Sequence, residues 1–214
     1  STAYSPDGLR IVTAGADKTA RVWDAETGRF LFELRGHKDS IQSATYSPDG
    51  RRIVTTSVDK TAKIWAADTG LHFTELKGHT DSVESATFSP NGRRIVTASE
   101  DDTARVWDAD TGQHLLDLRG HIFGVNSVTY SPDGRFITTT SKDKTARIWN
   151  ADGSGVPLVL HGHESPVNAV AFSPDGEKIV TGSTDKTARI WNANGSGTPL
   201  VFQGHEASVS SVAF

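Results

Sequence analysis

The segment Asp143-Lys144-Thr145-Ala146-Arg147-Ile148-Trp149 decides the fold, because four related segments of the chain also end on a tryptophan. The five tryptophans are residues 23, 65, 107, 149 and 191, so successive copies lie 42 residues apart. A fixed period of this length indicates stacked copies of one supersecondary unit. In each copy a turn precedes an alternation of polar and apolar residues, which predicts a strand with both faces at least partly covered.

Each period carries turn signals for four short strands, as residues 36–77 illustrate. Ser47-Pro48-Asp49-Gly50 predicts a tight turn, because proline presets φ, aspartate bonds its own backbone and glycine accepts a positive φ. Strands are expected at 41–46, 52–56, 61–65 and 72–76. One such sheet cannot bury both of its faces, so the copies are expected to stack face to face. Radial stacking gives a β-propeller, and a linear solenoid is the alternative.

Composition excludes several classes of protein. The 214 residues are 36% hydrophobic and 22% charged, which is outside the range of disordered chains. Cysteine is absent, so disulfides and thiolate metal sites are excluded. No apolar run approaches the length of a membrane helix, and a net charge of -4 gives no tendency toward nucleic acid. We therefore expect a cytoplasmic chain whose partners are proteins or peptides, not nucleic acid or membranes.

The repeated motifs resemble those of a known family. Gly-His, Ser-Pro-Asp-Gly, Asp-x-Thr and a final Trp recur in this order, and the pattern resembles WD40 repeats over the whole chain. The Trp-Asp pair itself stands only at 23–24 and 107–108, with Ala66, Asn150 and Asn192 in place of aspartate elsewhere. The close similarity between copies resembles recently amplified bacterial WD40 arrays, which commonly follow a signalling kinase or a nucleotide switch.

The resemblance implies an all-β propeller of four-stranded antiparallel blades. Blades are expected at approximately 1–35, 36–77, 78–119, 120–161 and 162–203, with the start of a further blade at 204–214. Residues 211–214 have the same phase as residues 1–4, so both would claim one inner strand in a closed ring of five blades. We therefore expect a segment of a larger ring of about seven blades, capped by further blades or another copy. The alternative is a closed five-bladed ring that binds a small ligand or peptide at its channel mouth.

A recurring set of His, Thr and Asp residues could be interpreted as a base, a nucleophile and an orienting group. An active site is needed only once, however, whereas this set occurs four times beside a tryptophan whose indole N–H needs a partner. The resemblance implies a buried structural chain from Asp to His to Thr to Trp. We expect no catalytic, cofactor-binding or metal-binding residues and no enzyme activity. The tetrads are His37, Thr55, Asp59 and Trp65; His79, Thr97, Asp101 and Trp107; His121, Thr139, Asp143 and Trp149; and His163, Thr181, Asp185 and Trp191.

Partner-binding positions also follow from the resemblance. In this family, partners often contact one end of the central channel through three positions per blade, and here these positions vary while their neighbours repeat. They are Ser40, Gln42 and Val58; Ser82, Glu84 and Glu100; Gly124, Asn126 and Lys142; and Pro166, Asn168 and Thr184, with Ala16, Ser208 and Ser210 completing the set.

The pair Ile122-Phe123 stands where the other copies have at least one polar residue, for example Lys38-Asp39. It is either an exposed anchor for a partner or a pair that folds onto an adjacent loop, and we expect the second. The expected function is a non-catalytic protein–protein interaction scaffold. A sensor domain that controls an attached kinase or STAND-type NTPase is the alternative.

Overall fold

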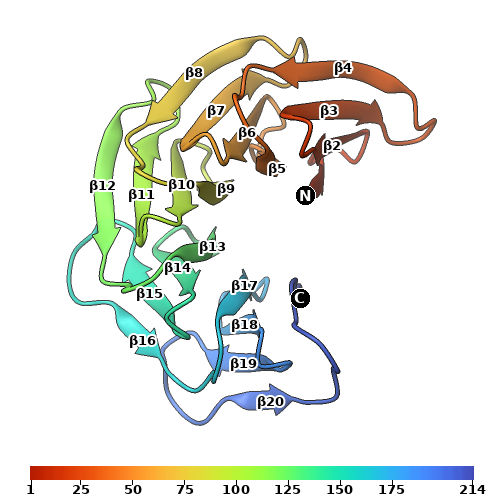
Figure 1. Cartoon of the computed structure of the whole chain (residues 1–214). Helices are drawn as coiled ribbons and strands as arrows, with labels where there is room; N and C mark the ends of the chain where they lie inside the picture. The colour runs from red at the N-terminus through yellow and green to blue at the C-terminus, as the bar shows by residue number, and fades with distance from the viewer. The chain divides into compact units, whose positions relative to one another are not determined.

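The computed structural model describes residues 1–214 as five four-stranded antiparallel sheets without a helix (Figure 1). The first sheet contains β1 (Thr2–Tyr4), β2 (Arg10–Ala14), β3 (Thr19–Asp24) and β4 (Phe30–Arg35). The second contains β5 (Ile41–Tyr46), β6 (Arg52–Ser57), β7 (Thr61–Ala66) and β8 (His72–Lys77). The third contains β9 (Val83–Phe88), β10 (Arg94–Ser99), β11 (Thr103–Asp108) and β12 (His114–Arg119).

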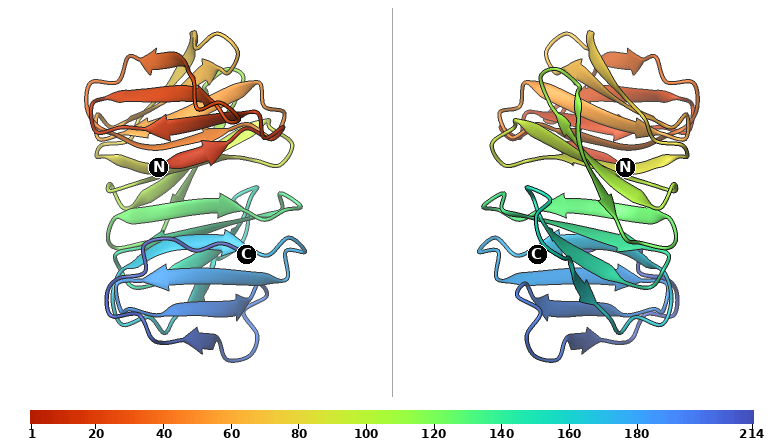
Figure 2. Two further views of the ribbon diagram at one scale, coloured as in Figure 1. Left: turned by 90° about the vertical axis from the view of Figure 1, so that its right-hand side faces the viewer. Right: turned by 90° about the vertical axis from the view of Figure 1, so that its left-hand side faces the viewer.

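The remaining two sheets follow the same order along the chain. The fourth contains β13 (Val125–Tyr130), β14 (Phe136–Ser141), β15 (Ala146–Asn150) and β16 (Leu158–Leu160). The fifth contains β17 (Val167–Phe172), β18 (Lys178–Ser183), β19 (Ala188–Asn192) and β20 (Leu200–Phe202). Each strand pairs with its neighbour in sequence, and the strands of the first sheet run side by side in Figure 2. The predicted all-β class and the four strands per repeat are confirmed.

Side-chain chemistry closes the tight turn between the second and third strands of each sheet. In the second sheet, the carboxylate of Asp59 accepts hydrogen bonds from the backbone N–H of Thr61 at 3.0 Å and from its hydroxyl at 2.6 Å. The intervening Lys60 has a φ of 72°, in the left-handed region that side chains rarely adopt. The aspartate therefore holds the turn in a conformation that lysine would not favour by itself.

The sheets are grouped in two compact units, Ser1–Asp101 with Arg105–Leu116, and Asp102–Ala104 with Asp117–Phe214. In the first unit, apolar residues of the first sheet such as Val22 and Leu34 pack against Ile53 and Trp65 of the second. The second unit has a corresponding core between the fourth and fifth sheets, where Ile148 meets residues of the fifth sheet. Within each unit, neighbouring sheets therefore bury their apolar faces against each other, as the repeat pattern predicted.

The segment after β20 forms no strand but packs on the fifth sheet. The backbone N–H of Val209 donates to the carbonyl of Ser183 at 2.9 Å, and the Val209 side chain is buried. A Cβ at Gly182 would lie 2.8 Å from Val209 Cγ1 and 2.9 Å from Val212 Cγ1, so the glycine makes room for this segment. The segment holds the position on the fifth sheet that β17 holds on the fourth, since Asn126 bonds the carbonyl of Val167 as Asn168 bonds that of Val209.

Candidate interaction face

In the second sheet, the four predicted tetrad residues form one hydrogen-bonded chain. The indole N–H of Trp65 donates to the hydroxyl oxygen of Thr55 at 2.8 Å, and that hydroxyl lies 2.8 Å from Nε2 of His37. Nδ1 of the same histidine lies 2.8 Å from Oδ2 of Asp59. These partners assign the proton to Nδ1, which donates to the carboxylate, while Nε2 accepts from the threonine. The chain ties the loop before β5 to the hairpin of β6 and β7.

The other three tetrads repeat this geometry. The imidazole Nδ1 to carboxylate distances are 2.8, 2.7 and 2.7 Å for His79–Asp101, His121–Asp143 and His163–Asp185. The Nε2 to hydroxyl distances are 2.7, 2.8 and 2.8 Å for His79–Thr97, His121–Thr139 and His163–Thr181. The indole to hydroxyl distances are 2.9 Å for Trp107–Thr97, Trp149–Thr139 and Trp191–Thr181.

Burial and hydrogen bonding set the charges in a tetrad. Burial lowers the pKa of His37, and its bond to Asp59 only partly offsets this effect. Burial opposes the charge of Asp59, but hydrogen bonds from the Thr61 hydroxyl, the Lys38 N–H and His37 outweigh it and hold the carboxyl pKa below its usual value. The favoured state is a neutral imidazole beside a carboxylate. The Thr55 hydroxyl is 0% exposed and already accepts an indole N–H, so it is out of reach of a substrate.

The first sheet carries an incomplete version of the hydrogen-bonded tetrad. Trp23 still donates to the hydroxyl of Thr13 at 2.9 Å. No histidine reaches Asp17, and the guanidinium of Arg21 donates to its Oδ2 at 2.7 Å instead. The Asp17 side chain is 49% exposed, against 7% for Asp59. The turn aspartate is therefore buried where a histidine binds it and exposed where none does. The first sheet can serve as a comparison for the complete tetrads within the same protein.

The three predicted contact positions of each repeat lie close together at one end of the inner strand. The backbone N–H of Val58 donates to the carbonyl of Ser40 at 3.0 Å. The corresponding bonds measure 2.9 Å for Glu100 to Ser82, Lys142 to Gly124 and Thr184 to Pro166. The structure therefore brings together residues that are about 18 positions apart in the chain, such as 40 and 58.

The second residue of each set, Gln42 in the second sheet, lies on a β-bulge that the sequence did not reveal. Ile41 pairs with Ser57 and Ser43 with Thr56, so Gln42 is an extra residue without a partner in the ladder. Glu84, Asn126 and Asn168 occupy the same place in the third, fourth and fifth sheets. A bulge redirects the side chain that it carries, and bulges are common beside functional sites.

The contact positions differ in how far they are available to a partner. Gln42, Lys142 and Thr184 are exposed, whereas Ser82 and Gly124 are buried. Asn126 donates to the carbonyl of Val167 at 2.8 Å, so it also serves to join two sheets. Seven contact positions are partly buried, namely Ser40, Val58, Glu84, Glu100, Asn126, Pro166 and Asn168. The three positions that complete the predicted set, Ala16, Ser208 and Ser210, are exposed.

The pair Ile122-Phe123 is exposed, by 70% and 56% respectively. The expectation that Phe123 folds onto an adjacent loop was therefore wrong. The loop is nevertheless held in place, because Ser141 Oγ donates to the Phe123 carbonyl at 2.7 Å and the Ile122 N–H donates to Asp143 Oδ2 at 3.3 Å. The same carboxylate binds His121, so the buried tetrad supports the loop directly.

Comparison with protein families agrees with this geometry. The family model of the WD domain, G-beta repeat (WD40), matches residues 1–24, 28–66, 70–108, 112–150 and 156–192. The chain belongs to the WD40 repeat family. The five sheets are therefore the blades of WD40 β-propeller repeats, a type of repeat that commonly mediates protein–protein interaction.

No group of three or more His, Cys, Asp or Glu side chains is placed to hold a metal ion. The structure also contains no helix of the length and apolarity needed to cross a membrane.

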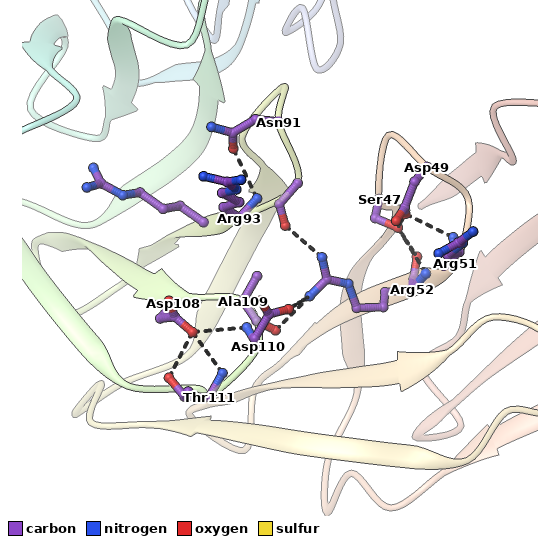
Figure 3. Close-up of polar contacts among 12 residues, drawn as sticks. Ser47, Asp49, Arg51, Arg52, Asn91, Arg93, Asp108, Ala109, Asp110 and Thr111 are labelled. Atoms are coloured by element: carbon purple, nitrogen blue, oxygen red, sulfur yellow. Dashed lines mark hydrogen bonds and ion pairs between the residues drawn. The ribbon is translucent and has the colours of Figure 1, made fainter.

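The structure reveals an inter-blade role for arginine that the sequence analysis missed. The guanidinium of Arg52 in the second blade reaches the third blade, where its Nη1 donates to the Ala109 carbonyl at 2.9 Å and to Asp110 Oδ1 at 2.7 Å (Figure 3). Its Nη2 donates to the Gly92 carbonyl at 2.7 Å. The signal was an arginine two residues after the glycine of the turn, at positions 10, 52 and 94.

Proposed function

We propose that this WD40 chain is a non-catalytic scaffold that binds a protein or peptide at the end of the blades where the bulges lie. The exposure of Ile122 and Phe123 carries the proposal, since the other blades have at least one polar residue at the same place. An apolar and aromatic pair of this kind is typical of an anchor at the centre of an interface. Single exposed apolar residues are common, whereas a pair on a loop supported from below suits recognition.

Support from the fourth blade makes this anchor rigid. The loop backbone is bonded to Ser141 and to the tetrad carboxylate of Asp143, whose side chain is 2% exposed. The exposed Lys142 lies beside the loop, because its N–H donates to the Gly124 carbonyl. A partner would therefore meet an apolar anchor and an adjacent cation in fixed positions, and little conformational entropy is lost when a rigid surface binds.

The experiment replaces the anchor without disturbing its support. The double variant Ile122→Ser with Phe123→Ser is compared with Leu71→Ser with Phe73→Ser, a matched apolar pair on the second blade that is 68% and 55% exposed. Affinity capture with the parent chain identifies partners, and their affinities for both variants are then measured with purified proteins. We expect the anchor variant to weaken binding about tenfold or more, the effect of losing about 1.4 kcal/mol, with an unchanged melting temperature. Equal affinity of both variants would contradict the proposal.

A further inference from the structure

Residues 10, 52, 136 and 178 hold the same position in the first, second, fourth and fifth blades, because they differ by multiples of 42. The first two are arginines that bind the next blade. Nη1 of Arg10 donates to the Ala67 carbonyl at 2.6 Å, as Nη1 of Arg52 does to the equivalent Ala109. The Arg52 guanidinium also lies 5.4 Å from the centre of the Phe88 ring. At these two junctions the chain therefore places its own guanidinium in the groove between blades.

The fourth blade has Phe136 at this position, and a phenyl ring has no hydrogen-bond donor. Its partly buried ring packs against the core between the fourth and fifth blades, as Phe172 and Ala193 also do. Ala193 and Gly176 correspond to Ala109 and Gly92, the two residues whose carbonyls bind Arg52. No backbone N–H of the turns and loops donates to the Ala193 or the Gly176 carbonyl. The acceptors of a guanidinium are therefore present at this junction while the guanidinium itself is missing.

A groove of about 810 Å³ lies between the fourth and fifth blades, beside Phe136. The corresponding depression between the first and second blades, which Arg10 lines, has about 440 Å³. Phe136, Pro132 and Ala193 give the larger groove an apolar wall. It is large enough for an amino-acid side chain with part of its backbone, and it lies within the range of ligand pockets.

The charges around the groove favour a cation. The lining carries a net charge of -2, because it contains three carboxylates, of Asp133, Asp175 and Glu177, and one ammonium, of Lys178. Lys178 is engaged by its own blade, since its Nζ donates to Asn192 Oδ1 at 2.6 Å. Hydrogen bonds from Ser131 and Ser173 lower the pKa of Asp133 and of Asp175 respectively, so both carboxyls stay ionised at neutral pH.

Arg135 is a further cation near this groove, beside Phe136 and Asp133. Its guanidinium carbon lies 5.7 Å from the centre of the Phe136 ring, and its Nε lies 3.8 Å from Asp133 Oδ2. The Arg135 side chain is 76% exposed and does not line the groove, so it does not occupy the place of the missing guanidinium. Its position shows that the Phe136 ring accepts a guanidinium on its face.

We propose that the groove between the fourth and fifth blades binds an arginine side chain of a partner peptide, in the place that Arg10 and Arg52 fill at the first two junctions. Two carbonyls of fixed spacing suit the planar fork of a guanidinium better than the single ammonium of lysine. The apolar wall suits the aliphatic stem of arginine, and the carboxylates suit its charge. The site lies by the Ser-Pro-Asp-Gly turns, at the opposite end of β17 from the bulge at Asn168, so it is separate from the interaction face proposed above.

The test uses short capped peptides and the parent chain. N-acetyl-Gly-Arg-Gly-amide is titrated into the isotope-labelled protein while backbone amide resonances are followed, and the citrulline and lysine peptides serve as controls. Citrulline keeps the shape of arginine but has no charge. We expect shifts confined to residues 132–136, 175–178 and 193–196, and a dissociation constant about tenfold lower for arginine than for citrulline. Equal affinities of the arginine and citrulline peptides would overturn the proposal.

Two reciprocal substitutions make the test specific. Phe136→Arg supplies the guanidinium from within the chain, as in the first and second blades, and should abolish the shifts. Arg52→Phe frees the Gly92 and Ala109 carbonyls and should add a second set of shifts around these residues. Thermal melts confirm that each variant is folded, and if Arg52→Phe unfolds, Phe136→Arg alone decides the outcome. Shifts that persist in a folded Phe136→Arg variant would refute an arginine site.

Discussion

Trp107 donates its indole N–H to the hydroxyl oxygen of Thr97 at 2.9 Å, and both side chains are buried in the third blade. The bond joins β11 to β10, and the Thr97 hydroxyl also lies 2.7 Å from His79 of the preceding loop. The indole packs in the core that the second and third blades share, together with Ile95 and Ala109. One side chain therefore joins the hydrogen-bonded tetrad to the apolar contact between two blades.

The first prediction is that Trp107→Ala strongly destabilises the chain. Removing the indole leaves a cavity between two blades and takes away the N–H that the Thr97 hydroxyl oxygen accepts. Emptying a large aromatic site in a packed core costs about 3–5 kcal/mol. The loss is measured as the change in free energy of unfolding from denaturant titration. Leu115→Ala is the control, because Leu115 is 44% exposed on β12 and its truncation should change stability by only about 0.5 kcal/mol. Equal midpoints for the two variants would show that the indole is not part of a cooperative core.

The second prediction concerns the turn aspartate of the third blade. Asp101 lies 2.8 Å from Nδ1 of His79, and its side chain is 4% exposed. Asp101→Asn removes the charge that orients the imidazole and should cost about 1–3 kcal/mol, the penalty for a poorly satisfied buried group. Asp17→Asn is the matched control, since Asp17 holds the same place in the first blade but is exposed and has no histidine partner. The control should change the midpoint of unfolding less than Asp101→Asn does, and the reverse order would contradict the structural role of the tetrad.

The third prediction is that acid destabilises the chain in two stages. Burial lowers the folded-state pKa of His37, His121 and His163, so on acidification each histidine takes up a proton in the unfolded chain first. The unfolded state then binds more protons, and stability falls as the pH drops below the unfolded histidine value of about 6.5. The partner carboxyls Asp59, Asp143 and Asp185 have pKa values below the unfolded value, so their contribution is lost only at lower pH, below about 4.

Thermal melts between pH 8 and pH 3 test this profile. We expect the melting temperature to be constant above about pH 7.5 and to fall below about pH 6.5, with a further decline below about pH 4. His205→Gln is the control, because His205 is exposed and belongs to none of the complete tetrads, so its replacement should leave the fall in melting temperature in place. A melting temperature that stays constant between pH 7.5 and pH 5 would contradict the assignment of neutral buried histidines.

The fold could be predicted from the sequence because the same turn and strand signals recur in the five repeats. The Ser-Pro-Asp-Gly turn and the alternation that ends on tryptophan both depend on local chemistry, and the strands of the second blade lie within one residue of their predicted ends. The bulge at Gln42 could not be predicted, because an extra residue in one strand is defined only by the pairing of its neighbours. The role of Arg52 was also hidden, since its acceptors are main-chain carbonyls 40 and 57 residues away.

Part of the candidate site could also be predicted from the sequence. The positions of Ser40 and Val58 followed from the family resemblance, and the structure joins them by a backbone hydrogen bond. The exposure of Phe123 did not follow, because a sequence shows that a residue is apolar but not whether a neighbouring loop is close enough to cover it. The Ser141 and Asp143 side chains bind the backbone of this loop.

The last prediction is that Arg52 stabilises the contact between the second and third blades. Its guanidinium makes three hydrogen bonds to the third blade, and its side chain is 18% exposed. Arg52→Ala leaves the Gly92 and Ala109 carbonyls without their donors and uncovers the ring of Phe88. We expect a loss of about 1–3 kcal/mol in the free energy of unfolding. Arg51→Ala is the control on the adjacent exposed residue, which removes the same charge without these bonds. If the two variants unfold at the same denaturant concentration, the hydrogen bonds of Arg52 do not contribute to the stability of the blade junction.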